Sequence, residues 1–124
     1  MTSARSARGA AARLSGRRGE VLAAVWLMAR GYRILGFRLK TPQAEIDLLA
    51  LRRGILAVVE VKQRASLAVA LETVSFDQRQ RLRRAGLAIA AGRPGLRDAS
   101  VRLDPMALAP GRLPRHIPDA WKGD

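Results

Sequence analysis

The spacing of apolar residues divides the first half of the chain into one helix followed by three strands. In residues 17–30 the apolar side chains recur at helical spacing, and the stripe ends at Arg30-Gly31, a pair typical of a helix C-terminus. Residues 32–39 (YRILGFRL) predict a strand that Gly36 interrupts, as at a β-bulge. Two further strands are predicted over residues 45–51 and 55–62.

The two later strands form a predicted hairpin, because only Arg52-Arg53-Gly54 separates them. In the second strand the run ILAVV is apolar at every position, which is typical of a central strand covered on both faces. A sheet covered on both faces needs helices on both sides, so the pattern favours an α/β fold.

The second half of the chain is less regular. Residues 64–74 have no clear pattern and we expect a loop there. Ser75 followed by Gln78 matches a capping box and begins a second predicted helix, which ends near the run GRPG. The run VRLD alternates like a strand, and Pro105 predicts that this strand lies at a sheet edge or ends there.

At 124 residues the chain is expected to form one domain. Residues 1–16 are small, basic and aperiodic, so we expect a disordered arm. The folded domain is predicted over residues 17–108, and residues 109–124 read as a Pro-rich tail in which the single histidine, His116, is solvated.

The charge balance of 23 Lys and Arg against 10 Asp and Glu gives a net charge of +13, which points to a polyanionic partner. Nucleic acid fits this charge best, although an anionic membrane or a ribosomal setting would give the same net charge. With 2 Trp, 1 Tyr and 2 Phe, contacts to the phosphate backbone are favoured over base stacking. The absence of cysteine excludes disulfides and thiolate zinc sites. No apolar run is long enough to cross a bilayer, so we expect a cytoplasmic protein without a membrane partner.

Charged residues stand inside the apolar hairpin. On a strand, Glu60 and Lys62 share a face, and an even-numbered turn would place Asp47 opposite Glu60 and Glu45 opposite Lys62. Two such carboxylates would attract Mg²⁺ or Mn²⁺, with the lysine able to stabilise charge on a phosphate or orient a water molecule. The alternative is a structural ion-pair network in which Glu45 pairs with Lys62 and Asp47 with an arginine.

Several of these runs together resemble a known family. RRGEVLAAVWLMARGYRIL, AEIDLLAL, VVEVKQR and VSFDQRQRLRRAGLAIA, followed by VRLD, look like the YraN-like family of small, largely uncharacterised bacterial proteins. The resemblance covers residues 17–104 and implies the restriction-endonuclease-like fold of the Holliday-junction resolvases, a three-layer α/β/α arrangement with a central mixed sheet.

The resemblance also implies a site. Asp47, Glu60 and Lys62 match the nuclease signature D…E-x-K and are the predicted catalytic residues. Asp47 and Glu60, with Glu20 from the first helix, are the predicted ligands of Mg²⁺ or Mn²⁺. Glu20 also fits a simpler role as a first-turn acid favoured by the helix dipole. Two positions depart from the family: Ala44 replaces a usual glycine, and Gln78 a usual lysine.

The first functional hypothesis is therefore a metal-dependent endonuclease of structured or branched DNA. We expect it to act as a homodimer, because cutting two strands symmetrically requires two sites. The second is a non-catalytic basic nucleic-acid-binding or adaptor protein in DNA repair, DNA uptake or RNA-associated processes. A membrane-surface protein leaves the hairpin carboxylates unexplained. In the first two cases the predicted nucleic-acid-binding residues are Arg17, Arg18, Arg64, Gln78, Arg79 and Arg81.

Overall fold

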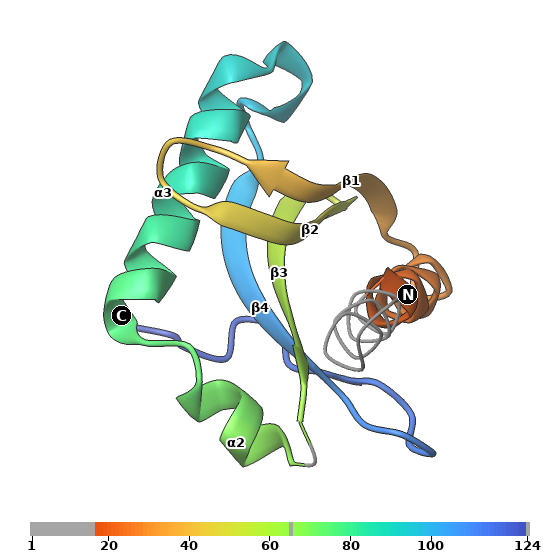
Figure 1. Cartoon of the computed structure of the whole chain (residues 1–124). Coiled ribbons are helices and arrows are strands. Elements are labelled where there is room, and N and C mark those ends of the chain that lie inside the picture. The colour runs from red at the N-terminus through yellow and green to blue at the C-terminus, as the bar shows by residue number, and fades with distance from the viewer. Residues whose placement is uncertain (1–16, 65, 124) are drawn as a thin grey trace, which may run out of the picture.

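A five-stranded mixed sheet forms the centre of the protein (Figure 1). The computed structural model describes residues 17–64 and 66–123, and the predicted arm, residues 1–16, lies outside this part. The strands follow one another across the sheet in chain order, with β3 and β4 parallel and all other neighbours antiparallel. They are β1 (Arg33–Lys40), β2 (Glu45–Arg52), β3 (Ile55–Gln63), β4 (Ser100–Leu108) and β5 (Arg115–His116).

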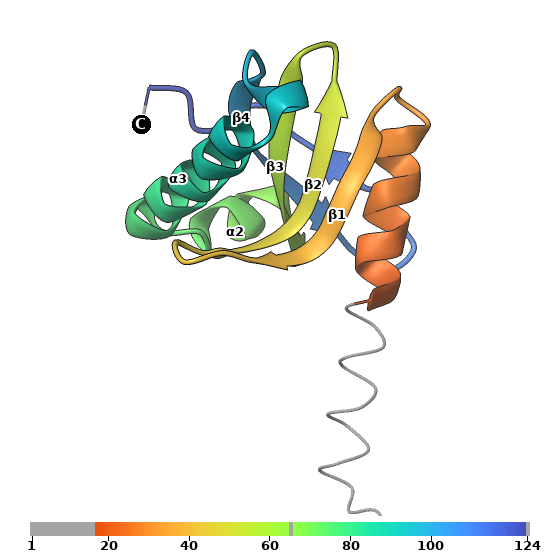
Figure 2. The same cartoon turned by 90° about the horizontal axis from the view of Figure 1, so that it is seen from above.

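Helices cover both faces of this sheet (Figure 2). The N-terminal helix, residues 17–28, buries Ala23 and Leu27 against one face. Helix α3 (Phe76–Gly92) packs Leu82 and Ala85 against the other, where α2 (Leu67–Glu72) also lies. The predicted three-layer α/β/α class with a mixed sheet is thereby confirmed. In the part of the chain that the structure describes, no helix is both long and apolar enough to cross a membrane.

The first helix ends in the way its sequence predicts. The Tyr32 N–H donates to the Leu27 carbonyl at 3.1 Å, and the Gly31 N–H donates to the Met28 carbonyl at 3.0 Å, which is a Schellman motif. Gly31 has φ +88°, a left-handed conformation that side chains disfavour. The chain therefore leaves the helix at a fixed angle and enters β1.

The hairpin register is the one expected for an even-numbered turn. Strands β2 and β3 are joined by the two residues Arg53 and Gly54, with φ of 48° and 76°, and Leu48 pairs with Val59. Positive φ at both central residues is the geometry of the hairpin turns that suit twisted strands. The register of β1 against β2 shifts between Ile34 and Gly36, so the bulge predicted beside Gly36 is confirmed.

The loop expected over residues 64–74 is partly helical. Helix α2 begins after Ser66, whose Oγ accepts the Val69 N–H at 3.2 Å, and it buries Ala70. Six helical residues do not show a readable periodicity, and a helix of that length depends on tertiary packing for its stability. The predicted second helix is confirmed as α3, and its cap is Ser75, which accepts the Gln78 N–H at 3.1 Å.

The prediction that the strand around residue 101 lies at an edge or ends at Pro105 is wrong. Strand β4 continues through Pro105 to Leu108 and lies between β3 and β5. The Pro105 carbonyl accepts the Ile117 N–H at 3.1 Å, so the main-chain groups of Pro105 face the β5 side. The missing N–H of proline therefore costs no hydrogen bond to β3.

The C-terminal segment is also more ordered than its Pro-rich sequence indicates. Within it β5 pairs with β4, with His116 opposite Met106. The His116 side chain is 6% exposed, so the expectation that it is solvated is wrong.

Candidate functional site

The candidate site forms where β2 and β3 separate. Their ladder ends at the pair Leu48 and Val59, and beyond it the Asp47 Oδ2 accepts the main-chain N–H of Val61 at 2.9 Å. The alternation of faces breaks here, because Ile46 packs under α3 whereas Leu48 packs under the N-terminal helix. The Asp47 carboxylate is consequently turned toward β3 rather than toward either helix layer.

Glu60 on β3 brings a second carboxylate to the same place. The residue is only 4% exposed. Its Oε1 lies 3.3 Å from the Lys62 Nζ, while its Oε2 is buried without a hydrogen-bond partner. A buried carboxylate oxygen with no donor is costly, and such groups mark sites that a ligand completes.

The two carboxylates perturb each other electrostatically. Burial, and then the nearby Asp47 carboxylate, raise the pKa of Glu60 to about 7, against the opposing effect of Lys62. Burial also raises the pKa of Asp47 above its usual value, although the Val61 N–H and Lys62 oppose this and Glu20 adds to it. The pair therefore carries less than two full negative charges near neutral pH, a condition that a cation would relieve.

Asp47 and Glu60 fit a divalent cation as a two-carboxylate site. The unpartnered Oε2 of Glu60 is the observation that favours it.

Glu20, the third predicted metal ligand, is held by Arg38, whose Nε lies 2.9 Å from both of its carboxylate oxygens. Within residues 17–64 and 66–123 no group of three or more Asp, Glu, His or Cys side chains is placed to hold a metal ion. Mg²⁺ commonly takes one or two carboxylates and completes its shell with water and phosphate oxygens, so two acids suffice chemically.

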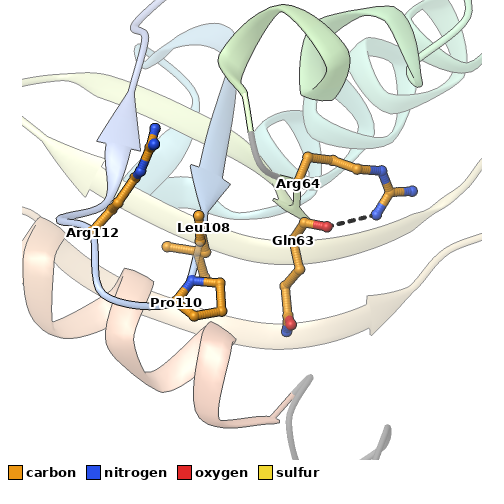
Figure 3. A pocket seen from close by; sticks show the side chains of 6 residues that line it. Gln63, Arg64, Leu108, Pro110 and Arg112 are labelled. Atoms are coloured by element: carbon orange, nitrogen blue, oxygen red, sulfur yellow. Dashed lines mark hydrogen bonds between the residues drawn. The ribbon is translucent and has the colours of Figure 1, made fainter.

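A basic groove lies at the C-terminal ends of β3 and β4 (Figure 3), and Asp47, Glu60 and Lys62 are not among the residues that line it. It has a volume of about 360 Å³, and a smaller hollow of about 200 Å³ shares four of its lining residues. Gln63, which directly follows Lys62, lines both parts. The charged residues along the basic groove are Arg18, Arg64 and Arg112.

The basic groove is shaped by side chains from distant segments. Figure 3 shows Arg64 turned back so that its Nη1 donates to the Gln63 carbonyl, at 2.8 Å. Leu108 and Pro110 form apolar walls. A groove with guanidinium groups along apolar walls can hold a phosphate backbone.

Comparison with known proteins places the chain in a family. The model of the "Uncharacterised protein family UPF0102" matches residues 19–108. The chain belongs to this family. The predicted YraN-like membership is thereby confirmed, because UPF0102 is the same family.

Relatives in UPF0102 align with nearly the whole chain. A UPF0102 protein of Caulobacter sp. (strain K31) is 74% identical over 117 residues, which cover 94% of this chain and 84% of the relative. One of Caulobacter vibrioides (strain NA1000 / CB15N) is 66% identical, covering 96% and 95%. One of Paramagnetospirillum magneticum (strain ATCC 700264 / AMB-1) is 48% identical, covering 92% of each chain.

In this UPF0102 chain some of the residues predicted to bind nucleic acid meet in the basic groove and others do not. Arg18 and Arg64 line it. Arg17 lines an apolar hollow beside it, together with Val21 and Val25.

The helix α3 residues predicted to bind nucleic acid are not among those lining the basic groove. Arg81 forms an ion pair with Asp77 at 2.8 Å, and the Arg79 guanidinium donates to the Val74 carbonyl at 2.8 Å. Gln78 serves α3 through its main-chain N–H. These contacts are those of a helix surface, and the assignment of the three residues to nucleic acid stays a prediction.

Two features were missed by the sequence reasoning. Arg112 of the basic groove lies in the segment interpreted as a tail, and its only local signal is the turn residue Gly111, which has φ +71°. Glu45 was considered as a partner of Lys62, but it is exposed and lies opposite Lys40 on β1. Lys62 instead pairs with Glu60 on its own strand.

Proposed function

We propose that this UPF0102 chain is a metal-dependent endonuclease that hydrolyses phosphodiester bonds in structured or branched DNA. The observation that supports it most is the Asp47 and Glu60 pair, in which one buried oxygen lacks a partner and the pKa of Glu60 is raised to about 7. The resemblance of these positions to D…E-x-K, the neighbouring Lys62 and the basic groove at the end of β3 agree with it.

Each residue has a role in this proposal. Asp47 and Glu60 hold Mg²⁺ or Mn²⁺, which when bound stabilises the negative charge that develops on the phosphate. Lys62 stands beside them, 3.3 Å from the Glu60 Oε1, where its ammonium group can contact a phosphate oxygen or orient the attacking water. Glu20 assists through the field that it exerts on Asp47.

In the reaction, the oxygen of a water molecule forms a bond to phosphorus and the bond from phosphorus to the leaving sugar oxygen breaks. The water gives up a proton and the leaving oxygen gains one. Arg18 and Arg64 of the basic groove would contact the DNA backbone at a distance from the scissile phosphate. Two copies of the chain would be needed to cut two strands symmetrically.

The test is cleavage of four-way junction, flap, single-stranded and duplex DNA, and of RNA, with Mg²⁺ or Mn²⁺. We expect wild-type protein to cut junction or flap DNA, and Asp47→Asn and Lys62→Ala each to lose about a hundredfold or more in rate. Matched controls are Asp77→Asn and Lys40→Ala, which change the same residue types at exposed positions. Both controls should keep the wild-type rate.

A non-catalytic adaptor is the second candidate, and the ion pair between Glu20 and Arg38 favours it, because that pair withdraws one predicted metal ligand. In that case no metal supports cleavage of any substrate. Binding to DNA would still be tight and sensitive to salt, and it would be unchanged in Asp47→Asn and Lys62→Ala.

A further inference from the structure

A second cavity, of about 440 Å³, lies between the end of the N-terminal helix and the docked C-terminal segment. Neither Glu60 nor Lys62 lines it, so it is distinct from the candidate metal site. Its walls include three arginines, two aromatic residues and the single histidine of the chain. The six are Trp26, Arg30, Tyr32, Arg52, Arg115 and His116.

The three arginines give this cavity an uncompensated positive charge. In the described part of the chain, Arg30, Arg52 and Arg115 form no ion pair with a carboxylate. The Arg30 guanidinium lies 3.5 Å from the centre of the Trp26 ring, and that of Arg52 lies 5.5 Å from the centre of the Tyr32 ring. The Arg30 Nη1 also donates to the Trp26 carbonyl at 3.4 Å. Stacking uses the face of a guanidinium group, so the remaining in-plane N–H donors are left for an anion.

The wall below these arginines is held rigidly. Arg102 donates to both oxygens of buried Asp104 at 2.8 Å and to the Tyr32 hydroxyl at 2.6 Å. His116 Nε2 lies 2.8 Å from the Asp104 Oδ2, and its ring meets the Tyr32 ring edge to face at 5.9 Å. The network fixes Tyr32 and His116, while Arg102 compensates the charge of Asp104. The cavity thus keeps its positive charge and is formed before any ligand arrives.

We infer that this cavity binds a nucleoside phosphate, either free or as the unpaired terminal nucleotide of a strand. The arginines supply donors to the phosphate, and Trp26, Ile117 and Pro118 supply apolar surface for the base, whereas Tyr32 is only 7% exposed and offers the base little surface. A volume of about 440 Å³ lies in the range of small-molecule sites and is too large for a phosphate ion alone. The inference goes beyond the proposed nuclease, since it requires neither a metal ion nor cleavage.

Two tryptophans on opposite faces of the sheet allow a direct test. Trp26 belongs to the cavity, whereas Trp121 packs against the cluster under α3. In ¹H–¹⁵N NMR spectra with a chelator present, AMP should shift the indole N–H signal of Trp26 and leave that of Trp121 in place. Adenosine and inorganic phosphate, used as separate probes, should each bind about tenfold or more weakly than AMP. Adenosine lacks the contacts to the arginines, and inorganic phosphate lacks the contacts of the base.

Charge-matched variants separate a built site from general attraction to a basic protein. The double variant Arg30→Gln, Arg52→Gln should weaken AMP binding by about tenfold or more. The control double variant, Arg33→Gln with Arg53→Gln, removes the same charge from exposed positions three and one residues further along the chain and should change AMP binding by less than about twofold. Equal loss in both variants, or equal shifts at Trp26 and Trp121, would overturn the inference.

The source of the nucleotide is decided by competition. The competitor is a single-stranded tetranucleotide with a 5′-phosphate. If it displaces AMP, the ligand is a strand end; if AMP stays bound, the ligand is the free nucleotide. Both outcomes support the inference. Absence of AMP binding overturns it. Repeating the titration with Asp47→Asn keeps this outcome separate from the proposed nuclease, because that substitution should leave AMP binding unchanged.

Discussion

Glu60 on β3 and Asp104 on β4 lie one register position apart on neighbouring parallel strands, and both are buried, at 4% and 0% exposure. Their surroundings differ in every other respect. Asp104 receives hydrogen bonds from Arg102, the His116 ring and the Asp119 N–H. Glu60 has Lys62 at 3.3 Å from one oxygen and a second acid, Asp47, beside it, and its other oxygen has no basic partner.

The pKa values follow from these contacts. Burial alone would raise the pKa of Asp104, but hydrogen bonds from His116 and Arg102 bring it below its usual value. For Glu60, burial and the Asp47 carboxylate act in the same direction and raise its pKa to about 7. The folded protein stabilises the charged form of Asp104, whereas it destabilises the charged form of Glu60. Destabilised charges of this kind are typical of functional groups.

The largest effect is expected from Asp104→Asn. The substitution leaves Arg102 without its counter-charge in a partly buried position, and we expect the free energy of unfolding to fall by about 3–5 kcal/mol. Urea unfolding at pH 7 measures it. The control Asp77→Asn, at a carboxylate that is 78% exposed, should change stability by less than about 0.5 kcal/mol. A loss at Asp104 no larger than that of the control would show that the network adds nothing.

Replacing Glu60 by its amide, Glu60→Gln, is expected to raise the free energy of unfolding above pH 7, whereas Asp104→Asn lowers it. Because the folded pKa is raised from 4.5 to about 7, the folded protein keeps a proton that the unfolded chain loses over this window. Wild-type stability should therefore decrease as the pH rises from about 4.5 to about 7, by up to about 3 kcal/mol. Glu60→Gln mimics the protonated form, so it should match wild type near pH 4 and be the more stable protein at pH 8. Parallel stability profiles for the two proteins would contradict this account.

A bound divalent cation should offset the loss of stability that the charged Glu60 causes at pH 8. At about thirty times its Kd, Mn²⁺ is expected to raise the free energy of unfolding of the wild type by about 2 kcal/mol at pH 8. Asp47→Asn and Glu60→Gln should lose this gain, while Asp104→Asn, although less stable, should keep it. Thermal unfolding with and without Mn²⁺ measures the effect, and an equal gain in all four proteins would mean that the ion binds elsewhere.

The smallest effect is expected at the partly exposed pair of Glu20 and Arg38. Arg38→Gln should cost less than about 1 kcal/mol of stability, because the Arg38 side chain is 38% exposed. It should also tighten Mn²⁺ binding, since it releases a carboxylate whose field already reaches Asp47. Arg33→Gln is the control for the lost charge. An Mn²⁺ affinity unchanged by Arg38→Gln would place Glu20 outside the metal site.

Much of the fold could be predicted because its signals are local. Gly31 ends the first helix, Ser75 begins α3, and Gly54 marks the turn of the hairpin, whose length the sequence left open. The structure shows the two-residue turn Arg53-Gly54, and Asp47 and Glu60 lie just beyond the last pair of the ladder, Leu48 and Val59. Each signal depends on residues a few positions apart, whose conformational preferences are largely intrinsic.

Other features depend on contacts between distant segments and could not be predicted. Arg38 engages Glu20 across 18 positions, and Arg102 reaches Tyr32 across 70. The C-terminal segment becomes part of the sheet only because β4 offers it a free edge, and that pairing buries His116 and creates the second cavity.

The sequence by itself determined the layer architecture, the presence of the hairpin and the identity of the acids beside Lys62. Only the tertiary structure decided which acid is neutralised and which oxygen is left without a donor. The reason is that a hairpin follows from short-range backbone preferences, whereas the charge state of a buried acid depends on which donors the rest of the chain brings within hydrogen-bonding distance.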